Sequence, residues 1–74
     1  MDPQATWDWL LQALDTGNWK AARRWAGKLL SWLAAGGKPP DTSIGRVSDS
    51  GWHRQVARHA CKMAIAIARR ESRG

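Results

Sequence analysis

The chain has 74 residues, enough for one domain, and its single cysteine, Cys61, excludes an intramolecular disulfide. The first residues lack the basic and apolar segments of a secretory signal, and no apolar run is long enough to span a bilayer. These features predict a cytoplasmic protein. Its net charge of +6, concentrated in residues 52–74, favours an acidic partner: nucleic acid, an anionic membrane or an acidic protein.

The first predicted helix covers residues 3–15. Asp2 is a favourable N-cap, and Pro3 suits the first helical position because its missing N–H would have no partner there. Apolar residues repeat at the spacing of one helical face: Trp7, Leu10, Leu11 and Leu14. Gly17 can adopt the left-handed conformation that closes a helix, and Asn18 can cap the next one.

The second predicted helix covers residues 19–35. Its apolar face consists of Trp19, Ala22, Ala26, Leu29, Leu30 and Leu33. Trp25 and Trp32 lie at one edge of this face. Gly36 and Gly37 end the helix, and the prolines at positions 39 and 40 prevent its continuation. The short link to the preceding helix predicts an antiparallel α-hairpin.

Residues 36–51 form a predicted loop, which Ile44 and Val47 are expected to pin to the helices. Ser48, Asp49 or Ser50 is expected to cap a third helix over residues 52–70. We assign its core face to Val56, Ala60, Met63 and Ile67, with Trp52 and His59 at the margin. A second face of small residues would let another helix come close: Ala57, Cys61, Ala64 and Ala68.

Together these elements predict an all-α protein in which residues 1–74 form one compact three-helix bundle. The hairpin also resembles a single tetratricopeptide repeat over residues 7–39. The resemblance rests on the Trp7-x-x-Leu10-Leu11-x-x-Leu14 spacing and on the Gly17-Asn18-Trp19-x-x-Ala22 turn. It departs from the repeat at Ala26, where an aromatic residue is expected, and at the late Pro39. The resemblance implies an α-hairpin that binds protein.

Two surfaces are candidates for function. The tryptophans outside the core stripes, Trp9, Trp25 and Trp32, predict a surface that binds a protein partner or a second copy, because exposed Trp is enriched in binding hot spots. The alternative is nucleic-acid binding along the basic face of the third helix. Residues four apart stack on one face and can follow phosphates: Arg54, Arg58 and Lys62, extended by Arg69 and Arg70.

Other chemistry has less support in the sequence. Lys20, Arg23, Arg24 and Lys28 give the second helix the pattern of a membrane-surface helix, but a core helix with a charged outer face has the same pattern. His59 and Cys61 point in nearly opposite directions and His53 adds no fourth ligand, so we expect no zinc site. Asp8 and Asp15 are ordinary outward charges. We therefore expect neither a cofactor nor a small-molecule substrate, and no enzymatic activity.

Overall fold

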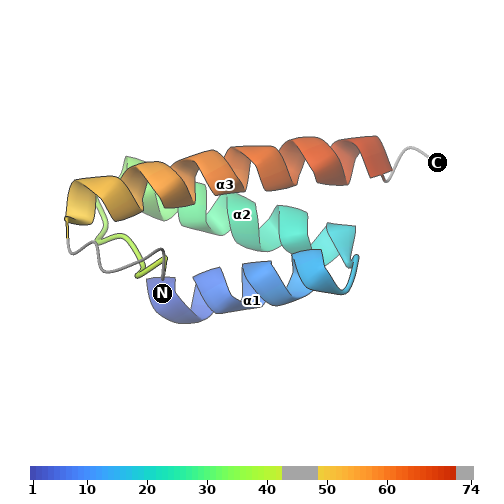
Figure 1. The fold of residues 1–74 in the computed structure, drawn as a ribbon, viewed down its shortest axis with the longest axis horizontal. Helices are drawn as coiled ribbons and strands as arrows, with labels where there is room; N and C mark the ends of the chain where they lie inside the picture. The colour runs from blue at the N-terminus through green and yellow to red at the C-terminus, as the bar shows by residue number, and fades with distance from the viewer. Residues whose placement is uncertain (43–48, 72–74) are drawn as a thin grey trace.

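The chain forms three helices in the computed structural model, which describes residues 1–42 and 49–71 (Figure 1). Helix α1 spans Pro3–Asp15, α2 spans Trp19–Ala34 and α3 spans Ser50–Glu71. The described residues contain no strand, and the predicted all-α three-helix bundle is confirmed. The predicted ends of the helices agree with the observed ones to within two residues.

Local hydrogen bonds at the predicted caps fix the hairpin. The Asp2 carboxylate accepts from the backbone N–H groups of Gln4 and Ala5, at 3.0 and 3.3 Å. Gly17 has a φ of 71°, and the N–H of Asn18 donates to the carbonyl of Ala13 at 2.9 Å, which closes α1. The Asn18 side chain then accepts from the N–H of Ala21 at 3.2 Å and opens α2.

The end of α2 is closed by the paired glycines. Gly36 has a φ of 86°, and the N–H of Gly37 donates to the carbonyl of Trp32 at 2.9 Å, the bond that defines a Schellman motif. The indole of Trp32 lies directly over Gly37, where a Cβ atom would overlap the ring. The turn is thus built around this tryptophan.

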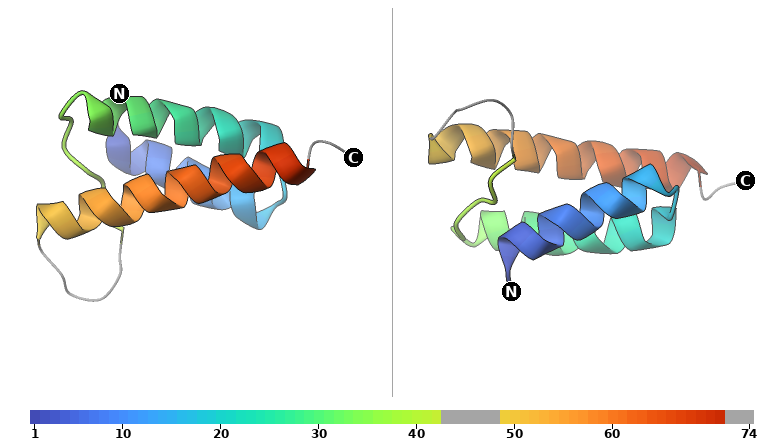
Figure 2. Two further views of the ribbon diagram at one scale, coloured as in Figure 1. Left: turned by 90° about the horizontal axis from the view of Figure 1, so that it is seen from above. Right: turned by 60° about the horizontal axis from the view of Figure 1, so that its bottom comes forward.

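Helix α2 is the central element of the bundle. Both α1 and α3 pack along it, whereas α1 and α3 make few contacts with each other. Figures 1 and 2 show α1 and α3 running in the same direction, with α2 antiparallel to both. The extents of 39 × 25 × 18 Å correspond to a bundle about two helices thick in its shortest direction.

The core lies where the three helices meet, and its α3 side differs from the prediction. Apart from His53, the buried residues of α3 are the small ones, Ala57, Cys61, Ala64 and Ala68. The predicted core face is wrong: Met63 is 51% exposed, and Val56, Ala60 and Ile67 are only partly buried. Small side chains let α3 approach α2 closely, and the leucines of α2 fill the space between them.

Residues 36–42 return across the end of the hairpin. The Gln4 side chain donates to the carbonyl of Asp41 at 3.2 Å and accepts from its N–H at 2.8 Å. The buried His53 accepts at Nδ1 from the N–H of Thr42, at 3.2 Å. At the start of α3, the Asp49 carboxylate accepts from the N–H of Gly51 at 2.8 Å. The predicted anchors Ile44 and Val47 fall in residues 43–48, outside the described residues.

Candidate functional site

The side chains of Trp9 and Trp25 form an aromatic pair across α1 and α2. Their ring centroids are 4.9 Å apart and their planes are tilted by 42°. Trp25 is partly buried against the core, whereas Trp9 is 48% exposed. The sequence predicts that Trp9 lies outside the core stripe of its helix, and in the structure it contacts Trp25 on one side and solvent on the other.

Two cations of α2 extend this pair. The Arg24 guanidinium lies 4.9 Å from the Trp25 ring centroid and the Lys28 ammonium lies 5.4 Å from it. Both distances fall within the range of a cation–π contact, each worth about 0.5–1 kcal/mol at an exposed site. The contacts hold two positive charges above an aromatic surface and leave their outward sides open to solvent.

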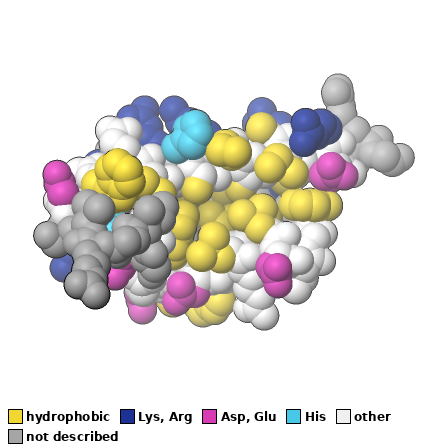
Figure 3. All heavy atoms as spheres, in the orientation of Figure 1, with side chains coloured by type: hydrophobic (Ala, Val, Ile, Leu, Met, Phe, Trp, Pro, Cys, Tyr) yellow, Lys and Arg dark blue, Asp and Glu magenta, His cyan; other side chains and the backbone are white. Residues whose placement is uncertain are grey.

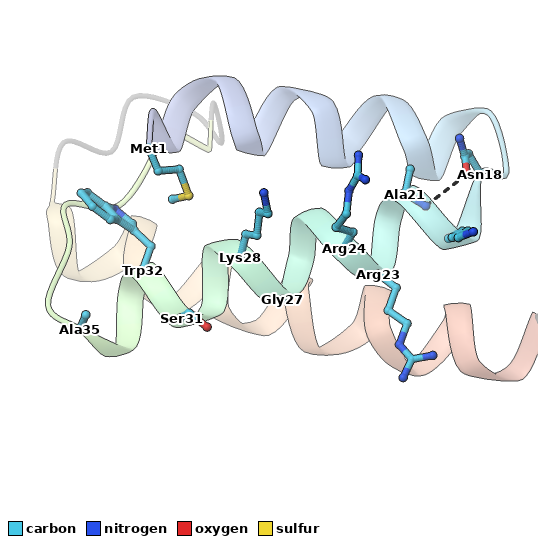
Figure 4. A pocket seen from close by; sticks show the side chains of 11 residues that line it. Met1, Asn18, Ala21, Arg23, Arg24, Gly27, Lys28, Ser31, Trp32 and Ala35 are labelled. Carbon is cyan, nitrogen blue, oxygen red and sulfur yellow. Dashed lines mark hydrogen bonds between the residues drawn. The ribbon is translucent and has the colours of Figure 1, made fainter.

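A groove of about 1050 Å³ runs along α2 beside these residues (Figure 4). Met1 and Trp32 lie toward one end, and Asn18 lies toward the other. Between them Arg24 and Lys28 rise from α2 toward α1, whereas Arg23 points the opposite way, toward α3. None of the described residues that line the groove is acidic; four of them are Lys or Arg: Lys20, Arg23, Arg24 and Lys28.

Trp32 is held rigidly at this groove. Its indole Nε1 donates to the carbonyl of Lys38 at 2.8 Å, and the ring lies on Gly37. The hydrogen bond satisfies its single polar group, so the exposed part of the ring presents an apolar wall. The structure therefore brings all three predicted tryptophans to the α1–α2 side of the bundle, with Trp9 the most exposed of them.

The predicted basic stripe of α3 divides into residues with different environments. The Arg54 guanidinium donates to the carbonyls of Leu33 and Gly37 at 2.8 and 2.7 Å, and thereby satisfies carbonyls at the C-terminal end of α2. Arg58 and Lys62 are exposed and line a second cavity, of about 460 Å³, together with Arg54 and Leu30. Arg69 and Arg70 lie exposed in the last turn of α3.

Charge is unevenly distributed over the three helices. Nine of the twelve Lys and Arg residues lie on α2 and α3, which carry one of the six acids, Glu71. Helix α1 carries Asp8 and Asp15 and no Lys or Arg. The potential around α2 and α3 is accordingly positive, and it attracts anionic groups toward both cavities.

The remaining candidates do not converge on a reactive site. His53 and Cys61 are buried and His59 is exposed, and no metal-binding cluster of His, Cys, Asp and Glu occurs among the described residues. Burial raises the pKa of the Cys61 thiol from 9.0 to about 11, which disfavours the reactive thiolate. Across residues 1–42 and 49–71, no helix combines the length and the apolar character needed to cross a membrane.

Comparisons with family models, curated proteins and solved structures give no match to this chain. Sequence patterns identified the tryptophans and also singled out Arg24 and Lys28, although as one face of a membrane-surface helix. They missed Met1 as a wall of the groove, because only the antiparallel packing of α1 brings the N-terminus beside Trp32.

Proposed function

We propose that this chain is a non-catalytic protein-interaction module, and that it binds an acidic segment of a partner protein in the α2 groove. One observation carries the proposal: the groove combines the wall of Trp32 with four Lys and Arg side chains and no acid among its described lining residues. The Trp9–Trp25 pair lies beside it and extends the aromatic surface.

The chemistry of the groove fits a peptide that is both apolar and acidic. Tryptophan contributes a large contact area with few rotatable bonds, so binding to it loses little conformational entropy. The hydrogen bond from Trp32 to the Lys38 carbonyl reduces that loss further, because the ring is already fixed. Arg24 and Lys28 can attract carboxylates, which raises the association rate and discriminates against basic partners.

The resemblance of residues 7–39 to a tetratricopeptide repeat supports the same proposal, since repeats of this family bind proteins through helical hairpins. An intracellular site of action agrees with the composition, because the chain has one cysteine and no disulfide. We accordingly propose a cytoplasmic partner.

Photocrosslinking in cells that make the protein tests this proposal. A benzophenone amino acid replaces Ser31, which lines the groove, and in a matched control it replaces Gln55, which is exposed on α3. We expect defined crosslinked proteins from position 31 and not from position 55. Equal crosslinking from both positions, or none from position 31, would contradict docking in the groove.

A second candidate function is nucleic-acid binding, favoured by the accumulation of Lys and Arg on α2 and α3. The candidate residues for phosphate contacts are Arg58 and Lys62 beside their shared cavity, with Arg69 and Arg70 beyond them. Arg54 is a weaker candidate, because its guanidinium already donates to two backbone carbonyls.

Fluorescence anisotropy with a duplex DNA and a single-stranded RNA, each measured over a range of salt concentrations, tests the second candidate. If Arg58 and Lys62 each neutralise a phosphate, their joint replacement by Ala lowers the slope of log affinity against log salt by about 2 for duplex DNA. Absence of binding at low salt would reject this function.

A further inference from the structure

Helix α3 carries more apolar surface than its packing on α2 uses. Because the small residues face the core, the larger ones lie on another side, at spacings that return to one helical face: Trp52, Val56, Met63 and Ile67. Met63 is 51% exposed. On α1, Leu11 is 44% exposed and Leu14 is partly exposed. We call Leu11, Leu14, Val56, Met63 and Ile67 the open face.

The open face lies between α1 and α3, on the side of the bundle where these two helices make few contacts with each other. Leu11 is about 160° around α1 from Trp9, which packs on α2, so Leu11 lies at the edge remote from that contact. Val56 is likewise about 160° from Arg58, which lines a cavity with α2. Figure 3 shows hydrophobic side chains in a continuous band between α1 and α3.

The two edges of this band carry opposite charge. In Figure 3 acidic side chains lie along the α1 edge and at the two ends of the molecule, and His, Lys and Arg gather along the α3 edge. The helix compositions explain this, because α1 has Asp8 and Asp15 without a Lys or Arg, whereas α3 has five Lys and Arg and one acid. A surface with an acidic edge, an apolar centre and a basic edge complements a copy of itself.

We propose that the open face binds a second copy of this chain, with the two-fold axis parallel to the helices. In this arrangement α1 of each copy lies over α3 of the other, and acidic edges meet basic edges. The other face-to-face arrangement would place α3 against α3 and bring the basic edge of one copy opposite the basic edge of the other, which is unfavourable. Charge thus selects both the occupant and its orientation.

The size of the face predicts a moderate affinity. Helix α1 has 13 residues and is therefore about 20 Å long, and the face is two helices wide. A face of these dimensions lies at the lower end of the size range of specific protein–protein interfaces, so we expect dissociation constants in the micromolar range. The dimer shares none of the residues of the α2 groove, so this inference stands independently of the proposed function.

Sedimentation velocity of the full chain over a range of concentrations tests the second copy as occupant. We expect a monomer–dimer equilibrium that weakens with salt. Met63→Glu and Leu11→Glu should each weaken dimerisation by at least about tenfold, because each places an unpaired charge in the interface. Ala66→Glu, at an exposed α3 position outside the open face, should not. A chain that stays monomeric, or a dimer that survives both open-face variants, overturns the proposal.

Disulfide trapping tests the orientation. Leu11→Cys and Met63→Cys are made as separate proteins of different tag length, mixed and oxidised; Cys61 stays in place because it is buried. The proposed two-fold axis predicts a mixed disulfide between the two variants. If each variant crosslinks only to itself, the helices meet like with like, and the proposed orientation is wrong.

Discussion

Trp9 of α1 and Trp25 of α2 pack with their ring centroids 4.9 Å apart, and Arg24 lies 4.9 Å from the centroid of the same Trp25 ring. One aromatic pair therefore joins the hairpin and also positions a cation beside the groove. The stability of the fold and the proposed binding surface share these side chains. Variants of these residues must accordingly be measured for both stability and binding.

Trp9→Ala should lower the free energy of unfolding by about 1–2 kcal/mol, because half of this side chain is already in contact with solvent. Its larger effect should be on binding, with crosslinking from position 31 reduced several-fold. Trp52→Ala is the matched control, since Trp52 is 45% exposed but lies on α3. Chemical denaturation and crosslinking yield measure the two effects. Equal losses of crosslinking in both variants would argue against Trp9 as a binding residue.

Arg54→Met should destabilise the protein by about 1.5–3 kcal/mol for each lost charged hydrogen bond that water does not replace. The exposed Arg58 makes no comparable contact among those described, so Arg58→Met should change stability by less than about 0.5 kcal/mol. Thermal unfolding followed by circular dichroism distinguishes them. Similar melting temperatures for the two variants would show that the cap formed by Arg54 contributes little.

Gly37→Ala should destabilise the turn by about 1–3 kcal/mol, because the new Cβ would displace the Trp32 ring that lies on this glycine. Gly27→Ala makes an informative comparison. Gly27 is inside α2 with no atom near its potential Cβ, so alanine there should stabilise the helix by up to about 1 kcal/mol. The emission spectrum of the tryptophans should change for Gly37→Ala. Opposite signs of the two stability changes are the expected result.

The raised pKa of Cys61 predicts a specific dependence on pH. Between the unfolded value near 9.0 and the folded value of about 11, only the unfolded chain forms the thiolate, so stability falls by about 1.4 kcal/mol per pH unit. Below pH 9 this contribution is fully present. Cys61→Ala should lack the additional loss, and denaturation curves of both proteins at several pH values measure the difference. Parallel pH profiles would contradict burial of the thiol.

The hairpin was predictable because its signals are local. Asp2, Gly17 and Asn18 cap the helices through neighbours no more than five residues away, so the residues that form these bonds lie within one short sequence window. The core face of α3 was not predictable in this way. Two apolar faces compete on that helix, and only the distance of closest approach to α2 decides in favour of the alanines over Met63.

The candidate site likewise combines features that local sequence patterns predict with contacts that they do not. The positions of Trp9, Trp25 and Trp32 on their helices followed from periodicity, but their contacts depend on residues distant in sequence. The Gln4 bonds to Asp41 and the contact of Arg54 with Leu33 join segments that no local pattern relates. The contact with Leu33 makes Arg54 a cap of α2, which its position in the basic stripe did not indicate.

The most direct test of the central claim is the crosslinking yield from position 31 in two charge-reversed variants. Arg24→Glu combined with Lys28→Glu reverses the charge of the groove, and Arg58→Glu combined with Lys62→Glu makes an equal change on α3. Docking of an acidic segment in the groove predicts loss of the crosslinked partner in the first variant and its retention in the second. Retention in the first variant, or equal loss in both, would contradict the proposed function.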